Sequence, residues 1–237
     1  MSPRTLLASV CFLMFPLLAL AQAQDSAPAA LHGEIQDGQY ISPTGLFQMP
    51  IPVLAPLGGT VSDSANVVTF RDAFTTSITV AVFPLSQAQV DEYHTIGSKD
   101  FLVQFFTNIV LKDLLSTYPG AAAESNARFI SKLDGGAVLV YTLLPGGSAF
   151  NSRIELFPGQ DAIPVAKRGN LAFVHDKNVI LISSELGERS TERSLYKLTP
   201  AEQDLVLRSR LVALADSMIL KSPATAPAAA NTAAPAK

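Results

Sequence analysis

The residue types of a hydrolytic triad occur close together in the C-terminal half of the sequence. His175 is followed by Asp176, and Ser183-Ser184-Glu185 comes shortly after. A histidine can activate a serine hydroxyl when a carboxylate orients its ring, so one alternative is a hydrolase that uses His175 with a serine. The Gly-x-Ser-x-Gly turn of serine hydrolases does not accompany these residues, and there is no oxyanion-hole motif. The grouping is more typical of a polar hairpin tip.

Metal and phosphate chemistry have little support in the sequence. His32, His94 and His175 are isolated, and none has a histidine or cysteine at metal-ligand spacing. Pro145-Gly146-Gly147-Ser148 lacks the Gly-Lys-Ser/Thr ending of a phosphate-binding loop and predicts a turn. We therefore expect no metal site, no cofactor and no catalytic residue.

The N-terminal residues are typical of a secretory signal peptide. Arg4 supplies the positive charge, residues 6–20 form an apolar run, and a small-x-small pattern follows. We expect residues 1–23 to be a signal peptide, with cleavage after Ala21 or Ala23. The exported protein would then be periplasmic or secreted.

Composition divides the rest of the chain into three parts. Residues 24–34 predict a flexible leader, and the Ala/Pro-rich residues 222–237 predict a disordered tail. Residues 35–221 have the length of a single domain. The net charge is −3 without a basic run, which argues against nucleic-acid binding. Cys11 is the sole cysteine and lies in the signal, and no other segment is apolar enough to span a membrane.

The most apolar stretch of the domain, residues 98–118, predicts a long central helix. No glycine or proline interrupts it, and only Gln104, Asn108 and Lys112 form a narrow polar strip. A helix of this kind must be buried on more than one side, and Ser98 is the expected N-cap. The predicted apolar face consists of Phe101, Leu102, Phe105, Phe106, Ile109, Val110, Leu111, Leu114 and Leu115.

Four aromatic residues in this region have two interpretations. Tyr93, Phe101, Phe105 and Phe106 could line a pocket for an apolar ligand, or the sheet could cover them as part of the core. The core is the simpler interpretation, and a ligand carrier is kept as an alternative. A carrier would need a lined cavity of roughly 300 Å³ or more.

Short β-branched segments precede and follow the helix. Residues 66–71 and 77–83 predict a hairpin, and near-continuous apolar runs such as residues 138–141 predict central strands. Asp134-Gly135-Gly136 and Asp176-Lys177-Asn178 predict tight turns. The remaining expectations are an irregular connection at 54–63, a strand at 152–157, and separate strands at 163–167 and 171–175.

The last helix has clear start signals. Thr199 and Glu202 form a capping box around Pro200, and Leu207, Leu211, Leu214 and Met218 follow as one stripe. Runs of strands separated by helices favour an α+β fold, in which an antiparallel sheet carries the long central helix and this C-terminal helix.

The order of these elements resembles that of the PsbP-like family. The similar features are Tyr40 with Ser42, Gly45 to Pro50, and the hairpin from Val67-Val68-Thr69-Phe70-Arg71 to Ser77-Ile78-Thr79-Val80. The resemblance spans about residues 39–220 and implies a PsbP-like sandwich. It also implies a non-enzymatic binding or accessory role, and it carries no catalytic motif.

The sequence therefore predicts an exported, non-enzymatic binding or accessory protein, with a partner protein in the bacterial envelope. The alternatives are the hydrolase that uses His175 and the carrier of an apolar ligand. A serine or aspartate within hydrogen-bond reach of His175 in a concave pocket would favour the hydrolase.

Overall fold

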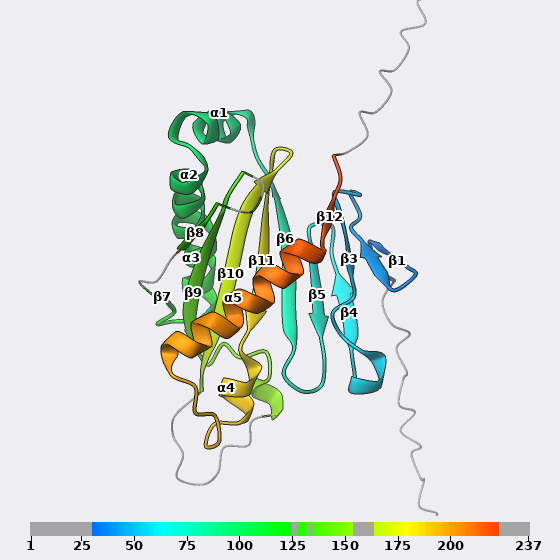
Figure 1. The fold of residues 1–237 in the computed structure, drawn as a ribbon, viewed down its shortest axis with the longest axis vertical. Coiled ribbons are helices and arrows are strands. Elements are labelled where there is room, and N and C mark those ends of the chain that lie inside the picture. Colours follow the sequence, from blue (N-terminus) through cyan, green and yellow to red (C-terminus); the bar gives the residue numbers. More distant parts are fainter. Residues whose placement is uncertain (1–29, 125–127, 132, 134, 154–163, 223–237) are drawn as a thin grey trace, which may run out of the picture. The chain divides into compact units, whose positions relative to one another are not determined.

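Two antiparallel sheets form the framework of the described chain. The computed structural model describes residues 30–124, 128–131, 133, 135–153 and 164–222. The strands are β1 (Glu34–Gln36), β2 (Gln39–Ile41), β3 (Phe47–Pro50), β4 (Thr60–Asp63), β5 (Val67–Arg71), β6 (Ser77–Pro84), β7 (Ala122–Ala123), β8 (Arg128–Ile130), β9 (Ala137–Pro145), β10 (Val165–His175), β11 (Asn178–Glu185) and β12 (Ile219–Leu220). The larger sheet has the order β4-β5-β6-β11-β10-β9-β7, with β8 also paired to β9, and the smaller has the order β1-β2-β3-β12 (Figure 1).

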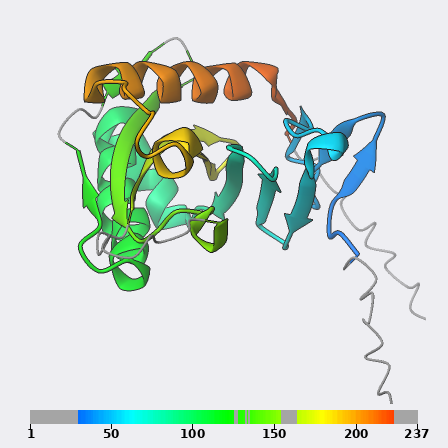
Figure 2. The same cartoon turned by 90° about the horizontal axis from the view of Figure 1, so that it is seen from below.

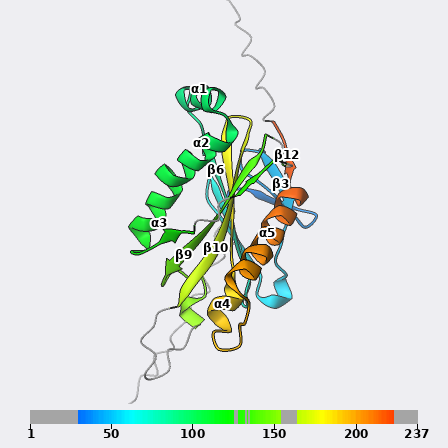
Figure 3. The same ribbon diagram turned by 60° about the vertical axis from the view of Figure 1, so that its left-hand side comes forward.

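Helices cover both faces of the larger sheet. They are α1 (Gln87–Ile96), α2 (Ser98–Phe105), the π-helix η2 (Phe106–Val110), α3 (Leu111–Thr117), α4 (Gly187–Thr191) and α5 (Pro200–Ser217), with the 3₁₀ turns η1 (Ala55–Leu57) and η3 (Asn151–Arg153). Figures 2 and 3 show α1 to α3 on one face of this sheet and α5 on the opposite face. The α+β fold class predicted from the sequence is confirmed.

Each face has its own hydrophobic core. On the α5 face, Leu207 and Leu211 pack with Leu139, Leu171 and Ile182 of the sheet, all of them buried. On the other face, the buried aromatic residues of α2 and η2 pack against Val138, Val140, Ala172 and Leu181. Alternate residues of one strand thus enter different cores, as the alternation of side chains across a pleated sheet requires.

The long strand β10 differs from the prediction of two separate strands. It runs without a break from Val165 to His175 and pairs with β9 and β11 over this length. Gly169, which interrupts the apolar pattern, lies beneath α5. A Cβ atom at this position would be 2.7 Å from Leu211 Cδ1 and 3.2 Å from Leu207 Cβ. The glycine therefore permits the close approach of the helix rather than ending the strand.

The central helix forms where the sequence predicts it, but it is not regular. The N–H of Leu111 bonds to the carbonyl of Phe106, so η2 contains one more residue per turn than an α-helix. Phe106 and Val110 are both buried, and the residues between them, including Ile109, are exposed. The prediction that Ile109 and Leu115 lie in the apolar face was wrong, because the extra residue rotates the positions that follow it.

The predicted N-cap of this helix was also wrong. Gly97 occupies the cap position, and its φ of 83° lies in the region that favours glycine. Ser98 is the first residue of α2 and makes no capping hydrogen bond. The break at Gly97 separates α1 from α2, and α1 has its own capping box, formed by Ser86 and Gln89.

Hydrogen bonds to the larger sheet extend into residues 32 and 33, before the expected domain boundary at residue 35. The backbone N–H groups of His32 and Gly33 donate to the carboxylate of Asp63, at 2.8 and 2.7 Å, and the Tyr40 hydroxyl donates to the same carboxylate at 2.7 Å. Asp63 ends β4, so the connection expected at 54–63 contains a strand. These bonds hold the end of the expected leader against the sheet.

Most of the remaining elements agree with the sequence where they are described. Thr199 and Glu202 cap α5, and Leu207 and Leu211 are buried beneath it. Gly135 and Gly136 have positive φ in the turn before β9. Residues 1–29, 154–163 and 223–237, together with Asp134, lie outside the described residues. They include the predicted signal peptide, most of the predicted tail and most of the predicted strand at 152–157. Ser152 and Arg153 belong to η3 instead.

Candidate functional site

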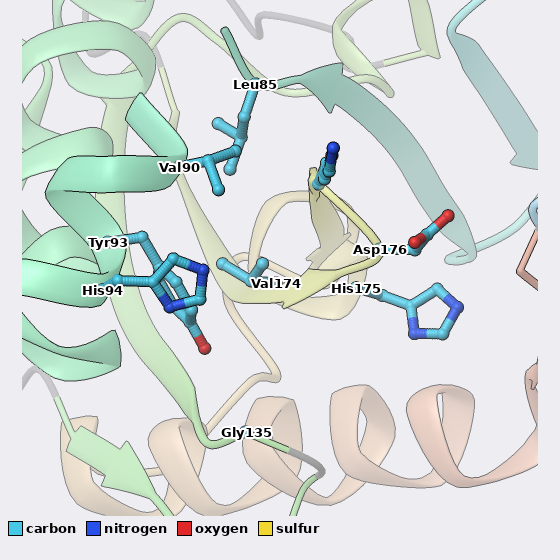
Figure 4. A pocket seen from close by; sticks show the side chains of 9 residues that line it. Leu85, Val90, Tyr93, His94, Gly135, Val174, His175 and Asp176 are labelled. Atoms are coloured by element: carbon cyan, nitrogen blue, oxygen red, sulfur yellow. The ribbon is translucent and has the colours of Figure 1, made fainter. Parts of the chain in front are cut away.

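A groove of about 320 Å³ lies between α1 and the tip of the β10–β11 hairpin. Figure 4 shows Tyr93 and His94 on α1 on one side and Val174, His175 and Asp176 of the hairpin on the other. The groove is lined by Leu85, Val90, Tyr93, His94, Gly135, Val174, His175, Asp176 and Lys177. Aliphatic side chains and ionisable groups thus share one concave surface.

The α1 wall of the groove follows from helical spacing. Val90, Tyr93 and His94 are three and four residues apart and therefore share one face of the helix. The Tyr93 ring packs edge-on against the buried ring of Phe101, with centroids 5.5 Å apart, and the His94 ring lies 5.4 Å from the Tyr93 ring. Contact with the core therefore orients the aromatic part of this wall.

The opposite wall is a two-residue turn without glycine. Asp176 and Lys177 have φ angles of 44° and 59°, as a type I′ hairpin requires. This backbone costs a non-glycine residue roughly 1–2 kcal/mol. The turn is held by hydrogen bonds from Asn178 Nδ2 to the Asp176 carbonyl, at 2.7 Å, and from the Leu85 N–H to the Lys177 carbonyl, at 2.8 Å. The backbone that carries two charged side chains is thereby held at the rim.

His175 lies at the edge of the groove. Alternation along β10 points Val174 towards α1 and His175 towards the face that carries α5, and Figure 4 shows the two side chains diverging. The Nε2 atom of His175 is buried and has no hydrogen-bond partner among the described residues. In the described part of the chain, no hydrogen bond joins its ring to Asp176 or to a serine.

The residue types of the hydrolytic triad are not brought together. His175 pairs with Asn178, whereas Ser183 and Ser184 pair with Asn170 and Gly169 further along β10. Five residues of extended strand separate Asn178 from Ser183, which is roughly 17 Å.

Ser183 and Glu185 of this grouping each have another partner. The Ser183 hydroxyl donates to Asn170 Oδ1 at 2.9 Å, and Glu185 accepts hydrogen bonds from the Ser148 hydroxyl and the Ala149 N–H. Ser183 and Glu185 are therefore engaged away from His175 and do not form a triad with it.

The aromatic residues considered for an apolar ligand belong mainly to the core. Phe101, Phe105 and Phe106 are 3%, 5% and 3% exposed, and the Phe105 ring packs edge-on against Phe83 at 5.3 Å. Tyr93 alone of the four lines the groove. The interpretation as core packing is therefore correct for the three phenylalanines.

A buried ion-pair cluster lies beneath α5, away from the groove. Lys167 Nζ is 2.7 Å from Glu124 Oε2 and 2.7 Å from Asp204 Oδ1, and the lysine is fully buried. The Tyr141 hydroxyl donates to the Asp204 carbonyl at 2.9 Å. Burial, followed by the negative charge of Asp204, raises the pKa of Tyr141 to about 12. The cluster joins α5 and the segment after β7 to β10, which is a structural role.

Sequence reasoning named His94 and His175 but did not bring them together. The groove joins segments about eighty residues apart in the chain, and no spacing within either segment indicates the other. The one available signal was the turn at residues 176–177, where charged residues replace the expected glycine. Lys167, Glu124 and Asp204 were missed for the same reason.

Two further tests concern metals and membranes. Within the described ranges, no group of three or more His, Cys, Asp or Glu side chains converges closely enough to hold a metal ion. Among the helices that the structure describes, none combines the length and apolar character that a membrane crossing requires.

Comparison with known proteins relates the chain to others by fold alone. No protein-family model matches the sequence, and no curated protein matches it. The solution structure of cyanobacterial PsbP from Synechocystis is 14% identical, covers 82% of this chain and 100% of its own, and has a TM-score of 0.47. The Ran-binding protein Mog1p of Saccharomyces cerevisiae is 11% identical, with coverages of 81% and 97% and a TM-score of 0.47. A mutant of Mog1 is 10% identical, with coverages of 79% and 97% and a TM-score of 0.48.

The resemblance to PsbP is therefore structural. It brings no residue roles to this chain, and the groove has to be interpreted from its own chemistry.

Proposed function

We propose that this chain is an exported, non-enzymatic binding protein that receives a segment of a protein partner in the groove between α1 and the β10–β11 hairpin. The observation that carries the proposal is the charged turn at Asp176 and Lys177, which forms the rim of a partly apolar groove. Residues that occupy positive φ at an energetic cost are concentrated at functional sites.

The groove has the chemistry of a peptide-binding surface. Leu85, Val90 and Val174 offer an apolar floor for an aliphatic side chain. Lys177 at the rim can pair with a carboxylate of the same ligand, and His94 can supply a further hydrogen bond. We therefore expect the partner to present an extended segment with an apolar residue next to an acidic one.

Support for export comes from the sequence. The order of a positive residue, an apolar run and a small-x-small pattern in residues 1–23 is that of a cleaved secretory signal. N-terminal sequencing of the protein recovered from the expressing cell is the direct test, and a mature chain that starts at Met1 would contradict the proposal.

Photo-crosslinking tests the groove itself. A photoreactive residue at His94 should form an adduct of defined mass with one partner, and the same residue at Lys112, which is exposed on α3, should not. Lys177→Glu reverses the rim charge and should abolish the adduct from position 94. Adducts of equal yield from both positions, or an adduct that survives Lys177→Glu, would rule out the groove as the binding site.

A further inference from the structure

A second cavity, of about 390 Å³, lies at the other end of β10. It opens where β10 begins, beside α4 and the N-terminal end of α5, which Figures 1 and 3 show close together. Its lining consists of Pro164, Val165, Arg189, Arg193, Tyr196 and Gln203. Roughly 30 Å of extended strand separate this cavity from the groove at His175.

A buried amide holds one of the two arginines in place. Gln203 is 6% exposed, accepts a hydrogen bond from Arg189 Nη1 at 2.8 Å, and donates to the Leu198 carbonyl at 2.8 Å. Both ends of the amide are therefore engaged. A guanidinium has five N–H donors, so Arg189 keeps further donors after binding Gln203.

Arg189 and Arg210 differ in their ion pairs with described carboxylates. Arg210, nearby on α5, forms an ion pair with Glu188 of α4. Among the described residues, no carboxylate lies within ion-pair distance of the Arg189 guanidinium. Glu192 is the other acidic residue of this segment, and its side chain is exposed. A half-buried cation is thus fixed in a cavity that a second arginine, Arg193, also lines.

Tyr196 contributes an independent sign of a ligand. Its hydroxyl oxygen is buried, and it has no hydrogen-bond partner among the described residues. A buried hydroxyl without a partner is costly, so such groups require an explanation. Burial raises the pKa of Tyr196, and the charge of Glu188 raises it further, so the hydroxyl stays protonated at neutral pH and can donate.

Arg189, Arg193 and Tyr196 all line this cavity, and each carries N–H or O–H donors. Guanidinium groups bind planar oxyanions through paired N–H bonds, and a phenolic hydroxyl adds a third donor from another direction. We propose that this cavity binds a small anion that carries a phosphate or carboxylate group. The site is separate from the groove and goes beyond the proposed partner binding.

The test is a titration of the purified protein with sodium phosphate and, separately, with sodium citrate. Sodium chloride keeps the ionic strength constant, and both the melting temperature and the heat of binding are measured. A ligand that binds the folded state raises the melting temperature in a saturable manner. We expect saturation with at least one of the two anions, and the preferred anion identifies the head group.

Two variants and a control connect the binding to this cavity. Tyr196→Phe keeps the ring that packs on the core and removes only the hydroxyl, so the melting temperature without anion should not fall. Its affinity for the anion should be about tenfold weaker, since one hydrogen bond to a charged group is lost. Arg189→Gln should weaken binding at least as much. Arg208→Gln, an exposed arginine of α5 outside the cavity, should bind like the unchanged protein.

Specific results would overturn the inference. One is a melting temperature that responds to phosphate and citrate only as it responds to chloride. Another is an affinity that Tyr196→Phe leaves unchanged. If Arg189→Gln lowers the melting temperature without anion, its weaker binding could come from a damaged fold. The affinity of Tyr196→Phe then decides whether the cavity binds the anion.

Discussion

The two halves of the larger sheet are built differently. Strands β9, β10 and β11 have helices on both faces, and nearly every residue of β11 is buried. Strand β5 buries one face only, since Val68 and Phe70 are buried whereas Val67, Thr69 and Arg71 are not. In β4, Val61 and Asp63 are half-buried and the alternate residues are exposed. The sequence distinguishes the two halves, since continuous apolar runs mark the first and alternation marks the second.

This comparison shows where the chain tolerates change. In the doubly covered half, substitution at most positions of a strand reaches a core. In the singly covered half, every second position faces solvent. Four predictions test this difference, beginning with the largest effect.

Lys167→Met should have the largest effect. It removes the cation between Glu124 and Asp204, on a strand buried on both faces, and takes this ion-pair contact from both carboxylates. We expect a loss of about 3–5 kcal/mol in the free energy of unfolding, measured by urea denaturation. Lys112→Met, at an exposed position, should stay within about 0.5 kcal/mol. A loss below about 1 kcal/mol at Lys167 would show that the cluster does not stabilise this half.

Leu211→Ala tests the helix that covers one face of this half. Leu211 is fully buried and lies directly over Gly169. Truncation should cost about 2–5 kcal/mol in denaturant titrations. Leu205 on the same helix is 60% exposed and serves as the matched control, for which we expect a change within about 0.5 kcal/mol. Similar losses at the two positions would mean that α5 does not pack on the sheet as described.

The same substitution in both halves tests the comparison directly. Val140 on β9 is 5% exposed and Val67 on β5 is 37% exposed. Val140→Ala should lower the free energy of unfolding by about 1.5 kcal/mol because two buried carbon groups are lost. Val67→Ala should cost less than about 0.5 kcal/mol. Equal costs would contradict the assignment of Val67 to an open face.

The smallest effect concerns acid stability at the edge of the singly covered half. Burial alone would raise the pKa of Asp63, but hydrogen bonds from Gly33, His32 and Tyr40 outweigh it and hold the pKa below its usual value. A depressed pKa stabilises the fold above the unfolded-state value, near pH 4, and this contribution is lost as the pH falls further.

Denaturation curves between pH 2 and pH 6 measure this contribution. Asp63→Asn should be less stable than the unchanged protein at pH 6, and the gap should narrow towards pH 2. A gap that is constant over this range would show that the carboxylate charge does not contribute.

Local patterns predicted the individual elements well, because the responsible interactions are close in sequence. The capping box at Thr199 and Glu202 and the turn at residues 176–177 are examples. The predictions were wrong where contacts between residues distant in the sequence determine the local structure. Gly169 and Asn170 are typical of a break in a strand. In the structure, α5 covers Gly169, and the Asn170 side chain forms hydrogen bonds with Thr142 and Ser183. The groove and the ion-pair cluster depend entirely on such distant contacts.

The π-helix η2 has a consequence for how this chain is compared with others. It acts as a phase shift of one residue, or about 100° of helical rotation, between the helix before Phe106 and the helix after Val110. A protein with a regular helix here would align with this one only after a one-residue gap within residues 106–110. After that gap, each residue of this chain takes the place of the preceding position in a regular helix. Leu114 therefore corresponds to position 113 of a regular helix.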